Sequence, residues 1–206
     1  MSSSSSSDAE ARVRGLVQRA LEEVLDGAGG ASSQSLAAQG AARSSSAGGS
    51  SLAEKSIAIG ADHGGFALKE RLGTLLRDRG WQVSDCGTFS TASCDYPDFA
   101  HEVAKRVAAR QCRWGVVVDG AGIGSAMVAN KVPGVRAALC YDLSSARNSR
   151  EHNHANVLTL GAGLVGPALA EQILLTWLET PWGEGRHARR AGMISAVEAS
   201  YSRPGS

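Results

Sequence analysis

The sequence predicts an α/β protein with a doubly wound, open parallel sheet of about five strands. Short apolar segments alternate with longer amphipathic segments from residue 56 to residue 201, and glycine-rich turns separate them. Strands that alternate with helices in this way form parallel βαβ units with right-handed crossovers. Ligands of such folds bind at the carboxyl ends of the strands. The residues that follow each strand are therefore the first candidates for a functional site.

Each expected element has its own local pattern. The segment 56–61 (SIAIGA) is a short apolar run typical of a buried strand, and the segment 114–118 (WGVVV) is strongly apolar. Gly80 ends the first helix, and the turn Tyr96-Pro97 precedes the second. The expected strands are 56–61, 81–87, 114–118, 135–141 and 157–160. The expected helices are 66–80, 98–111, 125–131, 143–152, 166–178 and 185–201.

The composition excludes several classes of function. The 206 residues include 21 Lys and Arg against 20 Asp and Glu, a net charge of +1, so we expect no nucleic-acid partner held by bulk phosphate attraction. The four cysteines are widely and irregularly spaced, which argues against a zinc site and predicts reduced thiols. The apolar stretch 157–178 contains Pro167, Glu171 and Gln172, so we do not expect it to span a membrane.

Two segments precede the predicted main domain, which covers residues 56–206. Residues 27–55 are rich in Gly, Ala and Ser and are expected to form a flexible linker. Residues 1–26 begin with a serine run and continue as an amphipathic helix over 8–26, whose apolar stripe is Val13, Leu16, Val17, Ala20, Leu21, Val24 and Leu25. Three alternatives remain for this stripe. It packs on its own domain, it belongs to a disordered tail, or it docks into a groove on another protein. Its acidic residues disfavour a membrane surface.

Two strand ends carry residues suited to chemistry. Asp62 and His63 follow the first strand and offer a carboxylate and an imidazole for proton transfer or anion contact, although an Asp here can simply cap the next helix. The loop from Gly120 to Gly124 exposes backbone amides before a helix, which suits a phosphate or a developing oxyanion. The alternative is that these glycines only form a tight turn between the strand and the helix. The loop lacks the spacing of nucleotide-binding motifs.

Further polar groups lie toward the end of the chain. Arg186 and Arg190 are four residues apart on an expected helix, so their guanidinium groups share one face and suit a phosphate. A solvated basic face is the simpler alternative. His152 could open a sugar ring by moving a proton on the ring oxygen, whereas His154 is expected at the surface.

Five motifs in one order resemble a known family. The segments IAIGADHGGFALKERL, DCGTFSTASCDYPDFA, GAGIGSAMVANKVPGVRAALCYD, SREHNHANVLTLG and GEGRHARRAGMI are similar to the ribose-5-phosphate isomerase B family, which includes galactose-6-phosphate and allose-6-phosphate isomerases. The resemblance covers residues 56–198. It implies a Rossmann-like three-layer α/β/α fold and a homodimer or tetramer with active sites at the dimer interface. It implies neither a metal nor a cofactor. The implied reaction is aldose–ketose isomerisation of a sugar phosphate through an enediolate.

The resemblance also assigns roles to residues. It implies sugar or phosphate contacts for Asp62 and His63, a position near the sugar for Tyr96, ring opening by His152 and a sugar contact for Asn153. Phosphate binding is implied for Arg186 and Arg190, which can come from the partner subunit. The amides of the loop would hold the enediolate oxygen, and the loop residues concerned are Gly120, Gly122, Ile123 and Gly124.

The sequence departs from the family pattern in its expected base. Many members carry a cysteine where this chain has Asp119, and others a glutamate where it has Ser125. We therefore expect Asp119 to be the catalytic base. Ala121 and Gly163 replace a threonine and an arginine that many members have. These changes leave three functions open: ribose 5-phosphate isomerisation, isomerisation of another pentose or hexose phosphate, or weak catalysis with retained binding.

The N-terminal extension has a resemblance of its own. A short amphipathic helix on a Gly/Ala/Ser linker is similar to the encapsulation peptides of enzymes packed inside bacterial microcompartments. The resemblance implies that residues 8–26 bind a shell protein. The expected location is then the bacterial cytoplasm, within the lumen of a microcompartment.

Overall fold

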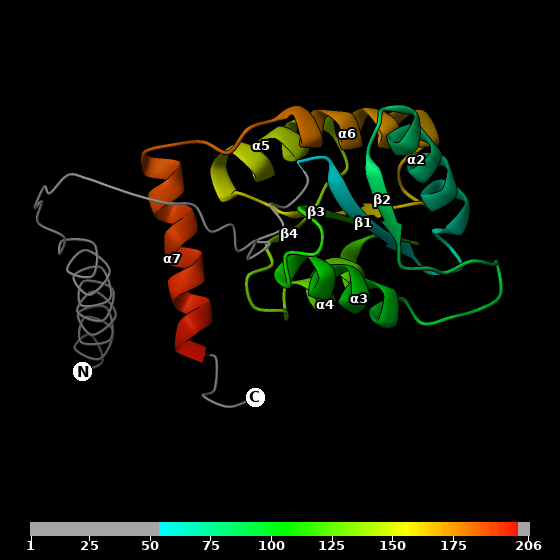
Figure 1. The fold of residues 1–206 in the computed structure, drawn as a ribbon, viewed down its shortest axis with the longest axis horizontal. Helices are drawn as coiled ribbons and strands as arrows, with labels where there is room; N and C mark the ends of the chain where they lie inside the picture. Colours follow the sequence, from blue (N-terminus) through cyan, green and yellow to red (C-terminus); the bar gives the residue numbers. More distant parts are fainter. Residues whose placement is uncertain (1–53, 202–206) are drawn as a thin grey trace, which may run out of the picture. The chain divides into compact units, whose positions relative to one another are not determined.

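A computed structural model describes residues 54–201 of the chain. The predicted helix over residues 8–26 lies outside the described residues, as does the predicted linker 27–55 except for its last two positions. The described part confirms the predicted α/β architecture, with one parallel sheet between two layers of helices (Figure 1). In the described part, no helix is both long and apolar enough to cross a membrane.

The sheet has five parallel strands in the order β2-β1-β3-β5-β4. The chain leaves β1 toward one edge of the sheet and returns to place β3 on the other side of β1. This reversal puts the loops after β1 and β3 next to each other, which is where open α/β sheets bind ligands. The strands are β1 Ser56–Ala61, β2 Gln82–Asp85, β3 Trp114–Asp119, β4 Ala137–Leu139 and β5 Val157–Gly161.

Helices cover both faces of the sheet (Figure 1). Helices α3 and α4 lie on one face, and α2, α5 and α6 lie on the other. Helix α7 follows them and packs against α5. The helices are α2 Phe66–Asp78, α3 Tyr96–Ala108, α4 Ile123–Ala129, α5 Leu143–Asn153, α6 Pro167–Glu179 and α7 Arg186–Tyr201.

The core explains why the three central strands are so apolar. Every residue of β1, β3 and β5 is buried, as expected for parallel strands covered on both faces. Successive side chains point to opposite faces: Ile57 and Ile59 pack in the cluster with α2 and α6, while Ala58 packs in the cluster with α3. This double burial fixes the strand ends that carry the candidate site.

Several element boundaries differ from the expected ones for local reasons. The edge strands β2 and β4 are shorter than expected because each pairs with only one neighbour. Helix α3 begins at Tyr96 because Pro97 occupies its first turn, where the fixed φ of proline suits a helix. Helix α4 begins at Ile123, directly after Gly122, whose φ of 77° closes the loop in the left-handed region.

Candidate active site

Asp119 organises the loop that follows β3. One carboxylate oxygen accepts hydrogen bonds from the amides of Ala121, at 2.8 Å, and Gly122; the other accepts from the amide of Ser125, at 3.1 Å, and from its hydroxyl. A carboxylate has about four acceptor positions, so these donors occupy all of them. The side chain is only 4% exposed. Asp119 therefore ends β3 directly before the predicted amide loop, and its hydrogen bonds hold the shape of that loop.

Other amides of this loop remain available. Among the described residues, the amides of Gly120, Ile123 and Gly124 have no acceptor. Glycine is required nearby, because a Cβ on Gly122 would lie 2.5 Å from Leu139 and 2.8 Å from the backbone of Leu160. The loop thus presents a small set of fixed donors, which is the arrangement that stabilises a developing oxyanion.

Tyr96 lies against the same loop. A Cβ on Gly124 would lie 2.5 Å from the phenol ring carbon and 2.7 Å from the phenol oxygen of Tyr96. The first turn of α3 therefore delivers this partly exposed side chain to the loop that follows β3. Glycine at position 124 leaves the room that the ring needs.

Asp62 and His63 extend the site from the end of β1. The Asp62 carboxylate accepts a hydrogen bond from the amide of Gly65 at 2.9 Å, and a Cβ on Gly64 would lie 3.8 Å from the amide nitrogen of Gly120. The loops after β1 and β3 are therefore in contact. His63 is exposed, and its Nδ1 lies 3.2 Å from the amide nitrogen of Cys94, which fixes the ring. We call Asp62, His63, Tyr96, Asp119 and the loop from Gly120 to Gly124 the carboxyl-edge cluster.

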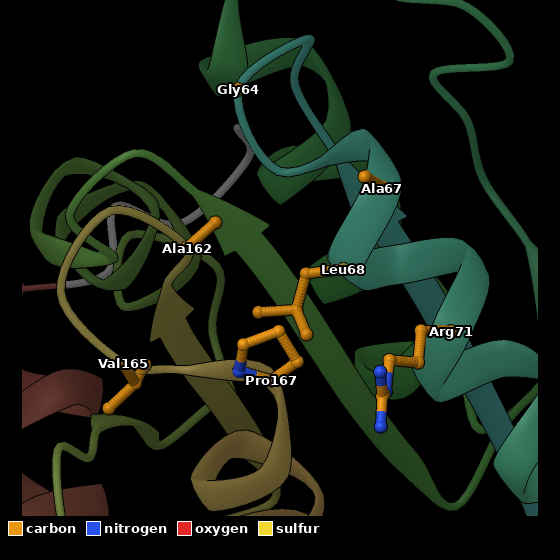
Figure 2. Close-up of a pocket in the computed structure, with 7 residues that line it drawn as sticks. All are labelled: Gly64, Ala67, Leu68, Arg71, Ala162, Val165 and Pro167. Atoms are coloured by element: carbon orange, nitrogen blue, oxygen red, sulfur yellow. The ribbon is translucent and has the colours of Figure 1, made fainter.

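A hollow of about 370 Å³ lies beside this cluster, between α2 and the loop that joins β5 to α6 (Figure 2). The Arg71 guanidinium belongs to its lining and forms an ion pair of 2.5 Å with Glu171. The hollow lies at the carboxyl edge of the sheet, where Gly64 follows β1 and Ala162 follows β5. Its lining residues are Gly64, Ala67, Leu68, Arg71, Ala162, Val165 and Pro167.

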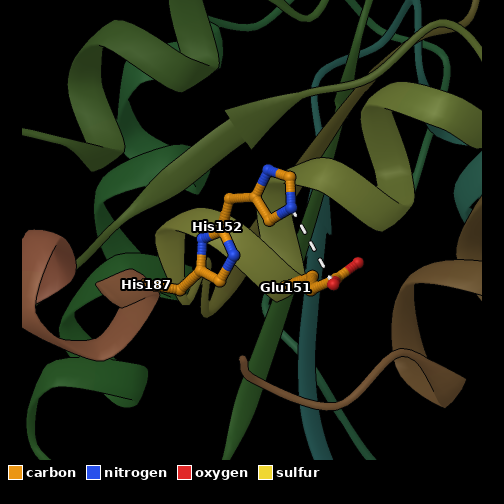
Figure 3. A group of neighbouring side chains, drawn as sticks. All are labelled: Glu151, His152 and His187. Atoms are coloured by element: carbon orange, nitrogen blue, oxygen red, sulfur yellow. Dashed lines mark ion pairs between the residues drawn. The ribbon is translucent and has the colours of Figure 1, made fainter. Parts of the chain in front are cut away.

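A second group of predicted site residues gathers where α5 ends and α7 begins. The rings of His152 and His187 are stacked, with centroids 4.1 Å apart and planes 5° from parallel (Figure 3). Nδ1 of His152 lies 2.9 Å from the side-chain nitrogen of Asn148. Arg186 lies next to His187 and donates to its Nε2 at 3.4 Å. We call His152, Asn153, Arg186, His187 and Arg190 the amino-edge cluster.

The two clusters lie at opposite edges of the sheet. Asp119 pairs with Gly161 at the carboxyl end of β5. Helix α5 runs back from the end of β4 and finishes at Asn153, just before β5 begins at Val157. Val157 and Gly161 are roughly 13 Å apart at about 3.3 Å per residue. One protomer therefore brings Asp62, His63 and Tyr96 to the loop of Asp119, but it does not bring His152, Asn153, Arg186 or Arg190 there.

Arg150 is a functional neighbour that the sequence did not reveal. Its guanidinium is 3% exposed and lies 3.9 Å from the ring centroid of Trp114 and 4.6 Å from that of Trp177. It donates to the carbonyls of Trp177, Thr180 and Ala155 at 3.0, 3.2 and 2.6 Å. Burial lowers its pKa to about 10, so it stays charged at neutral pH. Arg150 joins the end of α5 to the segment that leads into α7, and so positions the amino-edge cluster.

We expect Arg150→Met to lower the free energy of unfolding by about 2–4 kcal/mol, because it leaves buried carbonyl groups without donors. Urea denaturation followed by circular dichroism measures this loss. Arg150→Lys is the matched control, since it keeps the charge but cannot reach all three carbonyls, and it should lose less. A Met variant as stable as the wild type would show that the carbonyls find other donors.

The four cysteines are free, and their environments differ. Burial raises the pKa of Cys86 to about 11 and also raises those of Cys112 and Cys140. Since the thiolate is the reactive form, we expect iodoacetamide at pH 8 to alkylate partly exposed Cys94 well before the other three. Peptide mass spectrometry over a time course measures the order. Equal rates at Cys86 and Cys94 would contradict it.

The electrostatics of the second cluster favour a neutral His187. Desolvation lowers the pKa of His187, and the neighbouring His152 and Arg186 lower it further. Protonation of this ring therefore destabilises the folded state. As the pH falls below the ordinary histidine pKa of about 6.5, the free energy of unfolding decreases. At neutral pH the stacked pair does not carry two positive charges.

Comparisons with known proteins found relatives of the described domain in sequence and in fold. A family model described as Ribose/Galactose Isomerase matches residues 57–194. Ribose-5-phosphate isomerase B of Escherichia coli K12 is 42% identical over 144 residues, which cover 70% of this chain and 97% of that protein. The structure of ribose-5-phosphate isomerase B from Clostridium thermocellum is 48% identical, with a TM-score of 0.70, and covers 71% of this chain and 99% of that one.

A further solved relative contains a sugar phosphate. It is ribose-5-phosphate isomerase B from Mycoplasma genitalium with bound ribulose 5-phosphate, which is 36% identical with a TM-score of 0.68. The alignment covers 70% of this chain and 96% of that one. The family model matches residues 57–194, so it leaves out the first 56 residues of the chain.

Proposed function

Because this chain belongs to the ribose/galactose isomerase family, we propose that it interconverts ribose 5-phosphate and ribulose 5-phosphate through an enediolate. The chain is a sugar-phosphate isomerase of the ribose-5-phosphate isomerase B type. The observation that carries the finer proposal is the carboxyl-edge cluster, where a carboxylate lies beside unpaired backbone amides. Such a pair can move a proton between neighbouring carbons while the amides hold the oxygen.

In this proposal Asp119 is the base, and the Ser125 hydroxyl controls its access to the substrate. The Ala121 and Gly122 amides keep one carboxylate oxygen in place, while the other oxygen shares the Ser125 amide and hydroxyl. Rotation of that hydroxyl frees one acceptor position. The freed oxygen then takes the proton from C2 of the aldose and returns it to C1. The amides of Gly120, Ile123 and Gly124 stabilise the enediolate oxygen meanwhile.

The amino-edge cluster supplies the other half of the reaction. His152 moves the proton that opens the sugar ring, Asn153 contacts the sugar, and Arg186 with Arg190 binds the phosphate. Since this cluster lies across the sheet from Asp119, we propose that a complete site combines the carboxyl edge of one protomer with the amino edge of its partner. Two-fold symmetry then creates two such sites in a homodimer.

Exposed apolar side chains on α7 support a partner subunit. Met193, Ile194 and Val197 are 37%, 45% and 58% exposed, and Tyr201 is 85% exposed. A soluble monomer rarely exposes so many large apolar groups together. A second copy of the chain that covers them would also carry Arg186 and Arg190, at the start of the same helix, to a neighbouring site.

Substrate specificity is tested by NMR on the full chain with a panel of aldose and ketose phosphates. We expect ribose 5-phosphate to be converted fastest, with exchange of solvent deuterium at C2 and C1. Faster conversion of a hexose phosphate would replace the proposed substrate but keep the reaction. Binding of sugar phosphates without conversion of any would favour a catalytically weak protein.

The N-terminal extension carries a separate proposal. Residues 8–26 dock onto a microcompartment shell protein, and the linker 27–55 connects them to the enzyme, which places it in the lumen of a bacterial microcompartment. The support is the apolar helical stripe alone. We expect residues 1–55 fused to a fluorescent protein to form puncta in cells that make the cognate shell, while a fusion with Leu16→Glu and Leu21→Glu stays diffuse. Diffuse fluorescence of the unchanged fusion would contradict the docking role.

A further inference from the structure

The ends of α5 and α7 bring three metal-ligating side chains together. Glu151, His152 and His187 each offer one ligand atom, and these atoms all lie within 4.8 Å of one another (Figure 3). Two imidazoles and one carboxylate are the ligand set of many zinc sites that keep an open position. In a tetrahedral site with bonds of about 2.1 Å, ligand atoms are roughly 3.4 Å apart. Because imidazole lone pairs lie in the ring plane, the two rings must rotate out of their parallel stack to share one ion.

The surroundings allow this rotation and leave suitable atoms free. Glu151 and His152 are 54% and 38% exposed, and Oε1 of Glu151 lies 3.8 Å from Nε2 of His152. Asn148 contacts the other nitrogen, Nδ1, through its amide nitrogen. Ligation through Nε2 requires this amide to turn its oxygen toward Nδ1, which then donates to it and orients the ligating imidazole. On His187, Nε2 accepts a long hydrogen bond of 3.4 Å from Arg186, so its lone pair is the one that an ion would take.

We propose that Glu151, His152 and His187 bind a divalent transition-metal ion such as Zn²⁺, and that the bound ion inhibits the isomerase. The inhibitory half rests on the proposed function, because coordination of Nε2 removes His152 from proton transfer. Binding through Nε2 of His187 also displaces Arg186, so the ion competes with the sugar phosphate. The side chains of Glu151 and His152 are accessible to solvent, so a hydrated ion can reach them.

Charge sets the expected strength of this site. Glu151 is the only carboxylate of the three ligands, and Arg186 lies beside His187. The positive charge of Arg186 partly cancels the negative charge of Glu151. The affinity therefore comes mainly from the bonds between the ion and its imidazole and carboxylate ligands. Imidazole nitrogens suit zinc, copper and nickel, whereas magnesium and calcium prefer oxygen ligands. We therefore expect zinc to bind and magnesium not to compete.

The test measures binding and activity separately on the full chain. Equilibrium dialysis with ZnCl₂ in a phosphate-free buffer should give one zinc ion per chain. Glu151→Gln and His187→Ala should each weaken binding roughly tenfold or more, while His101→Ala, which removes an exposed histidine on α3, should bind zinc as the wild type does. Unchanged binding in both cluster variants would overturn the site.

Activity assays then test the inhibitory role. Zinc at saturating concentration should abolish conversion of ribose 5-phosphate by the wild type, and EDTA should restore it. Glu151→Gln should isomerise normally without zinc and need roughly tenfold more zinc for the same inhibition. Full activity of the zinc-loaded wild type would overturn the inhibition. No isomerisation in metal-free buffer would instead overturn the proposed substrate, while the dialysis result would still decide the zinc site.

Discussion

Two inactive variants, Asp119→Asn and His152→Ala, are expected to regain about a quarter of the wild-type activity when they are mixed and allowed to exchange subunits. Each alone should be inactive, because every site of its dimer lacks one essential group. If each site joins the carboxyl edge of one protomer to the amino edge of the other, half of the dimers formed at random are mixed, and each mixed dimer has one intact site. The opposite placement of the two clusters in one chain is the basis of this result.

The experiment refolds equimolar variants together from denaturant and measures isomerisation of ribose 5-phosphate. The matched control mixes His152→Ala with Arg186→Ala, since both changes affect the same cluster and no arrangement of these chains yields an intact site. Asp62→Asn can replace Asp119→Asn if the latter folds poorly. Recovery in the control, or none in the test mixture of folded variants, would show that the two clusters do not combine between protomers.

Much of the architecture could be predicted, because the spacing of apolar residues and the positions of glycines follow directly from the backbone conformation. The five strands and six helices of the domain follow from them, since parallel strands are buried on both faces. Strand-end position identified Asp62, His63, Asp119 and the loop from Gly120 to Gly124, because residues after parallel strands must lie at one edge of the sheet. Tyr96, which only the family resemblance implied, reaches Gly124 from the first turn of α3.

The remaining features depend on contacts between segments far apart in the chain. Nothing in the sequence around Arg150 indicates that Trp114, Trp177 and Trp182 surround it. The stack of His187 on His152 likewise follows from the packing of α7 against α5. A charged residue with no acidic neighbour at helical spacing is one signal that could have marked Arg150. For Asp119, position was predictable, but its four hydrogen bonds were not, because they depend on the loop's conformation.

Those four hydrogen bonds make Asp119 and Ser125 the decisive pair for the mechanism. Asp119→Asn should reduce kcat by about 10²–10⁴-fold, the usual contribution of a catalytic acid or base. Because an Asn side chain has only one acceptor oxygen, Asp119→Asn should also lower the free energy of unfolding by about 1–3 kcal/mol. A stopped-time assay of ribulose 5-phosphate, with urea denaturation of the same preparations, measures both effects.

Ser125→Ala separates the structural role of this carboxylate from its chemical role. The change removes the hydroxyl donor and leaves the amides of Ala121, Gly122 and Ser125 in place. The free energy of unfolding should fall by about 1 kcal/mol, but kcat should be maintained or rise, because an acceptor position of Asp119 is now permanently open. If Ser125→Ala lost as much activity as Asp119→Asn, the carboxylate would act only by shaping the loop. Near-normal turnover of Asp119→Asn would remove Asp119 from the proton transfer, and the base would have to be sought among the other groups at this edge, Asp62 first.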